Sequence, residues 1–288
     1  MAGRRAWVAM VCLLMLAWGE ASAQPQRATL AAGDPVIVAA AAQIAAHAGK
    51  HRLIVLGELH GTRQLPALTA ALVAHHAAQG PVTLALEVPQ TEQPAIEGYL
   101  ASDGGSAAWQ ALASTPFWQV HDDQHDGRRS VQMRQLVEVV RALGAQGAAV
   151  GVLAYDVAKE QADAHDHHWR DARMADNLRA AATQRSGMLL VLTGNVHAMR
   201  VRPSWAPPEM QLAPMTSQLL DLQPYAVNVT GASGQFWGCP QPAACRAIEA
   251  RSWQGGEDLR IDRDPERAYD LWLRLPELTL ADLVPAQD

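Results

Sequence analysis

Four apolar stretches in this chain each end on a polar residue that can take part in chemistry. They cover residues 53–56, 82–86, 150–154 and 189–192, and they lead in turn to His60, Glu87, Asp156 and His197. Near-continuous apolar runs of this length are typical of strands that are covered on both faces. Because parallel strands place their carboxyl ends along one edge of an open α/β sheet, we expect these side chains to meet at that edge, where such sheets bind ligands.

Segments with helical spacing of apolar residues separate these runs. Helices are expected at about 64–79, 130–143 and 167–185, and residues 91–145 are expected to form a smaller helical insertion between the second and third core strands. Strands that alternate with helices favour an α/β fold with a mostly parallel sheet flanked by helices. Further strands are predicted at Tyr225 to Thr230 and, as a final edge strand, at Tyr269 to Leu275.

The first 23 residues have the three parts of a cleavable secretory signal. Arg4 and Arg5 precede an apolar run at 6–18, and the small residues 21–23 follow it. Residues 24–288 are then expected to form one α/β domain in the periplasm or outside the cell. The apolar run is too short for a stable membrane-spanning helix, so we expect no transmembrane segment after cleavage.

The charge of the chain argues against a nucleic acid partner. Loss of the leader removes two positive charges and one negative charge, which changes the net charge from −6 to −7. Phosphate recognition needs clustered basic side chains, and an acidic chain is a poor candidate for it. A small-molecule or peptide substrate is the expected partner.

Cys239 and Cys245 are the cysteines outside the leader, and they lie in a segment rich in Gly and Pro. In an oxidising compartment, such a pair is expected to form a local disulfide that closes a loop. A redox or metal-binding role is the alternative, and a cytosolic location would favour it.

The turn that follows the first apolar run carries Glu58 and His60. An imidazole has a pKa near neutrality and can accept a proton from water, while a neighbouring carboxylate orients it and stabilises the imidazolium. The fourth run leads to His197 in a second Gly-x-x-His turn. Two such residues at one edge indicate either an acid–base pair or two metal ligands, His60 and His197. The alternative is that each imidazole is simply packed and hydrogen-bonded.

Glu87 is expected at the same edge, where a buried carboxylate needs a positively charged partner. Candidate partners are Arg63, Arg128, Arg129 and Arg170. Glu87 is predicted to be catalytic, and an ion pair that only stabilises the fold is the alternative. Arg128, Asp156 and Arg170 are the candidate substrate-binding residues, with the same structural alternative for Asp156. The charged segment at 121–129 is expected to be a solvated loop.

At these residues the chain resembles the superfamily that joins erythromycin esterase-like proteins, ChaN-like haem-binding proteins and the Tiki/TraB proteins. The resemblance covers about residues 50–200. The motifs that carry it are Gly57-Glu58-Leu59-His60-Gly61-Thr62, Glu87 followed by Gln90 and Gln93, Arg170-Asp171-x-x-Met174-Ala175-x-Asn177, and Gly194-Asn195-x-His197.

The resemblance implies an α/β fold with both Gly-x-x-His turns in the site. In the esterase-like members the first His and its neighbouring Glu activate water, which implies that role for His60 and Glu58. In the Tiki-like members the two His residues hold a divalent metal for peptide hydrolysis, whereas the ChaN-like members bind haem. The chain lacks a Gly-x-Ser-x-Gly motif, so the usual nucleophilic serine is absent. We therefore expect a hydrolase of esters or amides, with a haem- or iron-binding protein as the alternative.

Overall fold

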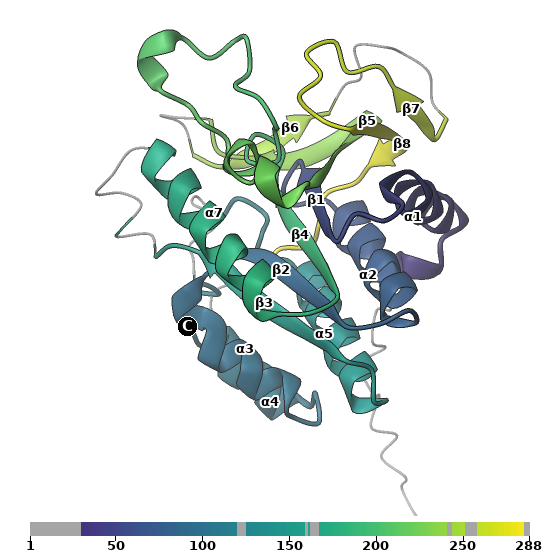
Figure 1. The fold of residues 1–288 in the computed structure, drawn as a ribbon. Coiled ribbons are helices and arrows are strands. Elements are labelled where there is room, and N and C mark those ends of the chain that lie inside the picture. The colour runs from purple at the N-terminus through teal and green to yellow at the C-terminus, as the bar shows by residue number, and fades with distance from the viewer. Residues whose placement is uncertain are drawn as a thin grey trace, which may run out of the picture.

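The structure of the protein is a computed structural model (Figure 1). The residues that it describes are 30–119, 125–158, 161, 167–240, 244–250 and 258–284. The predicted signal segment, residues 1–23, lies outside the described residues.

A central sheet of eight strands organises the fold. From one edge to the other the strand order is β3-β2-β4-β1-β5-β8-β7, and β6 pairs with the outer part of β5. Neighbouring strands from β3 to β8 are parallel, whereas the pairs β7–β8 and β5–β6 are antiparallel. The strands are β1 (Leu53–Glu58), β2 (Val82–Pro89), β3 (Val150–Asp156), β4 (Met188–Gly194), β5 (Tyr225–Gly238), β6 (Arg246–Glu249), β7 (Arg260–Asp262) and β8 (Leu271–Leu278).

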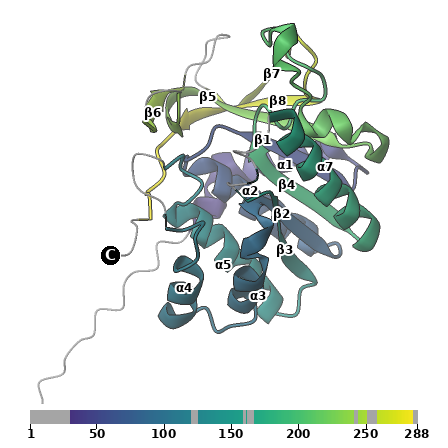
Figure 2. The same ribbon diagram turned by 90° about the vertical axis from the view of Figure 1, so that its left-hand side faces the viewer.

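Helices cover both faces of this sheet. Figure 2 shows β2, β3 and β4 between α5 on one side and α7 on the other. The α-helices are α1 (Pro35–Ala48), α2 (Gln64–Ala77), α3 (Gln93–Leu100), α4 (Ser106–Ala113), α5 (Val131–Ala145) and α7 (His167–Gln184). Short 3₁₀ helices are η1 (Ala31–Gly33), η2 (Gln90–Glu92), η4 (Pro208–Met210), η5 (Met215–Gln218) and η6 (Leu220–Leu222).

Alternation of side chains along each strand divides the core into two layers. In β1, Ile54 and Leu56 belong to the layer beneath α1, α2 and α5, while Leu53 and Val55 belong to the layer beneath α7. Successive side chains of a strand point to opposite faces, so an unbroken apolar run supplies both layers at once. The runs that predicted the strands are therefore explained by burial on both faces.

Capping residues begin two of the helices. The Asp34 carboxylate accepts hydrogen bonds from the backbone N–H groups of Val36 and Ile37, and Pro35 occupies the first turn of α1. The Ser130 hydroxyl accepts a hydrogen bond from the N–H of Met133 at the start of α5. Both caps satisfy backbone donors that have no partner within the helix. The start of α5 matters for the site, because the segment before it carries Arg128.

The predicted fold class is confirmed: the protein is α/β, with a mostly parallel sheet flanked by helices. Helices α3, α4 and α5 lie between β2 and β3 in the chain, as expected for the segment at 91–145. The prediction that Tyr269 to Leu275 forms an edge strand is wrong, because β8 lies between β5 and the short strand β7. None of the described helices is long and apolar enough to cross a membrane.

The central strands are expected to dominate the stability of the fold. Leu190 in β4 is fully buried, whereas Leu220 is 46% exposed. We expect Leu190→Ala to lower the free energy of unfolding by about 2–5 kcal/mol, because it removes buried apolar contacts and leaves a cavity. Leu220→Ala, the matched control, should cost less than about 0.5 kcal/mol. Urea unfolding of both variants measures the difference, and equal losses would contradict the assignment of the core.

Candidate active site at the carboxyl edge of the sheet

The carboxyl ends of β1 to β4 bring the predicted site residues together. Glu58 is the last residue of β1, Glu87 lies near the end of β2, Asp156 ends β3, and the turn after β4 carries His197. Helix α7 adds Arg170, and the segment before α5 adds Arg128. The two Gly-x-x-His turns touch, since a Cβ on Gly194 would lie 3.0 Å from Nε2 of His60. The seven residues predicted for catalysis and substrate binding therefore form one connected cluster.

Glu87 lies at the centre of this cluster and is 5% exposed. Its Oε1 accepts hydrogen bonds from Arg170 Nη2 at 2.7 Å and from Arg128 Nη1 at 3.1 Å. Its Oε2 accepts from the Thr193 hydroxyl at 2.8 Å and from the N–H of Gly194 at 2.7 Å. Burial raises the pKa of Glu87, but the surrounding positive charges outweigh burial and hold the pKa well below its ordinary value. Glu87 is therefore an ionised anchor whose lone pairs are occupied.

The two guanidinium groups beside Glu87 are also paired with aspartates. Arg170 forms a bidentate pair with Asp156, with Nε–Oδ1 at 3.0 Å and Nη2–Oδ2 at 2.6 Å. Arg128 donates from Nε to Asp126 at 2.8 Å and from Nη1 to the backbone oxygen of Glu87 at 3.1 Å. Bidentate pairs fix the plane of a guanidinium as well as its position. Substrate binding by Arg128, Asp156 and Arg170 stays a prediction, and in this arrangement these residues bind one another.

One ring nitrogen of His60 has a hydrogen-bond partner, and the other has none within the described part of the chain. Its Nδ1 lies 2.9 Å from Glu58 Oε1, whereas its Nε2 lies 3.9 Å from Glu87 Oε2, beyond hydrogen-bond length. The side chain of His60 is 21% exposed. Burial alone would lower the pKa of His60, but the hydrogen bond to Glu58 and the charges of Glu58 and Glu87 outweigh burial and raise it. This imidazole can take up a proton at Nε2.

His197 is held on both sides. Its Nδ1 lies 2.7 Å from Asp171 Oδ1, and its Nε2 lies 3.1 Å from Arg170 Nη1. A guanidinium has donors and no acceptor, so Nε2 of His197 accepts this hydrogen bond and the ring proton lies on Nδ1. The lone pair of Nε2 is thus occupied by Arg170. The two imidazoles of the site differ: His60 presents a free nitrogen, and His197 does not.

Sequence reasoning assigned no role to Asp171, Asp126 or Thr193. Asp171 is fully buried and also accepts a hydrogen bond from the N–H of Met215 at 2.7 Å, so it links His197 to η5. The sequence did contain a pointer to Asp171, because Asp171 directly follows Arg170 in the motif of α7. Adjacent helical residues point in different directions, and here one contacts Glu87 while the other contacts His197. Asp126 pairs with Arg128, and Thr193 donates a hydrogen bond to Glu87. Only the three-dimensional structure reveals these two contacts.

Residues 121–124 of the expected solvated loop lie outside the described residues. The rest, from His125 to Arg129, is largely buried against the site, which corrects the expectation for this part. His125 is fully buried and Arg129 is 6% exposed. Gly61 (φ +68°) and Gly127 (φ +86°) pack so closely that a Cβ on Gly127 would lie 2.3 Å from the Cα of Gly61. The chain can approach itself this closely only at glycine. This contact joins the turn that carries His60 to the segment that carries Arg128.

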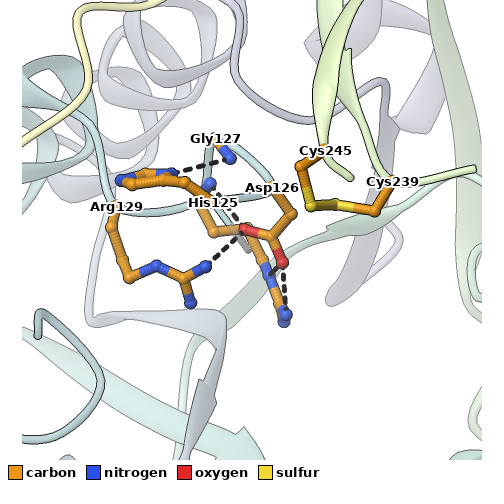
Figure 3. Close-up of a disulfide and its surroundings, with 7 residues drawn as sticks. His125, Asp126, Gly127, Arg129, Cys239 and Cys245 are labelled. Carbon is orange, nitrogen blue, oxygen red and sulfur yellow. Dashed lines mark hydrogen bonds and ion pairs between the residues drawn. A yellow bond between two sulfur atoms is a disulfide. The ribbon is translucent and has the colours of Figure 1, made fainter. Parts of the chain in front are cut away.

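The hairpin of β5 and β6 holds the same contact from outside. The side chain of Trp237 packs against Gly61 and Gly127, and the backbone N–H of Trp237 donates to the backbone oxygen of His60 at 3.0 Å. Two residues further on, Cys239 forms the expected disulfide with Cys245. Figure 3 shows this disulfide beside the segment from His125 to Arg129. The disulfide therefore closes the hairpin that supports the turn carrying His60.

The arrangement does not fit a divalent metal held by His60 and His197. In the described part of the chain, no group of three or more His, Cys, Asp or Glu side chains is placed to hold a metal ion. Arg170 donates to Nε2 of His197, and the charges of Arg170 and Arg128 already neutralise Glu87. A cation bound here would have to displace Arg170 from His197 and a guanidinium group from Glu87.

A small hollow of about 10 Å³ lies beside Glu58, Glu87, Arg128 and Met133, and it has room for about one water molecule. His60 and His197 do not line this hollow. Haem binding at the imidazoles therefore stays a prediction.

Comparison with known proteins shows the fold alone. No family model and no curated protein matches the chain. Among solved structures, the chain is similar to a succinoglycan biosynthesis protein, with a TM-score of 0.63, 10% identity, and coverage of 84% of this chain and 92% of that chain. A Bacillus cereus protein gives a TM-score of 0.61 at 10% identity, with coverage of 84% and 92%. A mutant of the erythromycin esterase EreC in its open conformation gives a TM-score of 0.63 at 11% identity, with coverage of 84% and 95%.

The charge of Glu87 is expected to stabilise the site. Glu87→Gln keeps the shape of the side chain but leaves two guanidinium groups without their shared carboxylate, so we expect a loss of about 3–5 kcal/mol in the free energy of unfolding near neutral pH. Because folding lowers the pKa of Glu87, its stabilisation is present above the unfolded value of about 4.5 and is lost as the pH falls through the folded value. The gap between wild type and variant should therefore narrow below about pH 4.5.

Urea unfolding at neutral pH and at about pH 3 measures this gap. Glu209→Gln is the control, because Glu209 is exposed and lies away from the cluster. A gap that stays constant over this range, or one no larger than that of the control, would contradict an ionised Glu87.

Proposed function

We propose that the protein is a hydrolase of the periplasm or the extracellular space, in which His60 removes a proton from water and the resulting hydroxide attacks an ester or amide carbonyl. The observation that carries this proposal is the difference between the two imidazoles. Nε2 of His60 has no hydrogen bond to the described part of the chain, whereas Nε2 of His197 accepts from Arg170. A general base needs a nitrogen lone pair within reach of the water.

Glu58 supports the base through Nδ1. Its hydrogen bond to His60 fixes the ring so that Nε2 points toward Glu87 and Gly194, and its charge stabilises the imidazolium that forms when the proton arrives. Burial raises the pKa of Glu58, and the hydrogen bond to His60 opposes this shift only in part. Glu58 therefore increases the proton affinity of His60, which suits His60 to act as a base.

Arg128 and Arg170 supply positive charge beside the base. Their side chains are 19% and 18% exposed. As the water attacks, negative charge develops on the carbonyl oxygen, and a fixed guanidinium stabilises that charge without reorganisation. Glu87 and His197 act by holding the guanidinium of Arg170 in place. The tetrahedral intermediate then breaks its bond to the alcohol or amine, and this leaving group takes the proton back from Nε2 of His60. The reaction needs no covalent enzyme intermediate.

The fold similarity supports a hydrolase without establishing one. The EreC mutant is an erythromycin esterase, and its fold matches over 84% of this chain. At 11% identity this likeness carries no substrate over. The export of the protein rests on the expected signal segment and agrees with the disulfide.

Loss of the base should slow hydrolysis strongly. We expect His60→Ala to lower kcat/KM for para-nitrophenyl acetate by about 10²–10⁴-fold, the range that a general base contributes. His75→Ala is the matched control, because His75 is an exposed imidazole of α2, and it should retain wild-type activity. Initial rates of both variants provide the test. Full activity of the His60 variant in a preparation that hydrolyses the ester would remove His60 from the mechanism.

The pH dependence should identify the base. His60 must be unprotonated to accept a proton, so kcat/KM should rise with pH through a limb that lies above 6.5, the ordinary pKa of His, because Glu58 and Glu87 raise the pKa of His60. Glu58→Gln removes the main cause of that rise, and its limb should move to lower pH. A limb at or below 6.5 in the wild type, or one that Glu58→Gln leaves in place, would contradict the assignment.

A further inference from the structure

A second hollow lies at the opposite end of the sheet from the imidazoles. It has a volume of about 180 Å³ and is formed by the amino ends of β1, β2 and β4 and by the last turn of α7. Leu53 begins β1 and Glu58 ends it, so five residue steps of about 3.3 Å separate the two ends by roughly 17 Å. The hollow is therefore distinct from the candidate active site.

Two guanidinium groups, those of Arg52 and Arg185, line this hollow. Arg52 donates from Nε to the backbone oxygen of Gly187 at 3.2 Å, and neither Arg52 nor Arg185 forms an ion pair within the described part of the chain. The residues that line the hollow include no acidic side chain. By contrast, Arg63, Arg141 and Arg179 each pair with a carboxylate. Two uncompensated positive charges at one hollow favour an anion.

The other walls combine one hydroxyl with apolar surface. Thr83 is 6% exposed, and its hydroxyl makes no hydrogen bond to the described part of the chain. Leu53, Ala181 and Leu189 provide buried apolar surface on the same side of the sheet. A ligand that carries a negative group and an apolar group would contact both kinds of wall.

The turn that carries Arg185 is fixed before any ligand arrives. Gly187 has φ +87°, and a Cβ there would lie 2.1 Å from the backbone oxygen of Pro81. The N–H of Met188 donates to that same oxygen at 2.9 Å, and the N–H of Leu189 donates to the backbone oxygen of Arg52 at 2.8 Å. These contacts tie the starts of β1, β2 and β4 together, which reduces the entropy lost on binding.

We propose that this hollow is a binding site for a small organic anion, with its carboxylate between Arg52 and Arg185 and its apolar part against Leu53 and Leu189. The volume of about 180 Å³ suits a carboxylate on one ring or a short chain. It is smaller than the roughly 300 Å³ of pockets for larger ligands.

The test is a titration of the full chain with benzoate, acetate and inorganic phosphate, followed by heteronuclear NMR. Benzoate should bind saturably at millimolar concentration or below, with shifts centred on the amides of Arg52, Thr83 and Gly187. It should bind about tenfold more tightly than acetate, because its ring contacts the apolar wall. Phosphate carries charge without an apolar group, so it should bind more weakly than benzoate.

Charge-removing variants complete the test. Arg185→Gln should weaken benzoate binding by about tenfold, and the additional change Arg52→Gln should abolish saturable binding. Arg173→Gln is the control on the same helix, because Arg173 is exposed and pairs with Asp176, and it should bind as the wild type does. Unchanged thermal unfolding shows that each variant is folded.

Three results would overturn the proposal: shifts centred elsewhere on the protein, phosphate binding as tightly as benzoate, or benzoate binding that survives in the double variant. The readout is direct binding at the amino ends of the strands. It does not depend on the hydrolase proposal.

Discussion

The buried carboxylate of Glu87 is the interaction on which the rest of the site depends. Four donors converge on it, two from guanidinium groups and two from the end of β4. An ionised carboxylate at this depth is stable only when its partners are in place, and those partners in turn need the carboxylate. Glu87 thereby joins three elements that are distant in the chain: β4, α7 and the segment before α5. The positions of Arg128 and Arg170 follow from this one charge.

This arrangement gives the two imidazoles different chemistry, although their turns look alike in the sequence. Arg170 bridges Glu87, Asp156 and His197, and it occupies Nε2 of His197 as it does so. His60 has its own carboxylate partner in Glu58 and keeps its Nε2 open. The pair is therefore not symmetric, and Arg170 occupies the nitrogen of His197 that a metal would need. One imidazole is available to move a proton, while the other holds a guanidinium.

The sequence predicts much of the fold because burial on both faces produces continuous apolar runs. The ends of those runs also locate Glu58, Glu87 and Asp156, since a parallel sheet brings such ends together. The sequence does not reveal the strand order, because packing between distant elements decides which strands pair. For the same reason β8 was expected at the edge of the sheet, where the structure has β7. Strand β7 has three residues and no apolar run to indicate it. Asp171 and the buried segment at 125–129 were missed because their polar character is typical of solvated surface.

The most direct test of this account is the protonation of the two imidazoles, measured by ¹⁵N NMR of the ring nitrogens between about pH 6 and 9. We predict that Nε2 of His60 loses a proton as the pH rises, and that the neutral ring of His197 carries its proton on Nδ1. A neutral His197 ring with its proton on Nε2, or a His60 ring whose Nε2 stays protonated throughout, would contradict the assignment of His60 as the base.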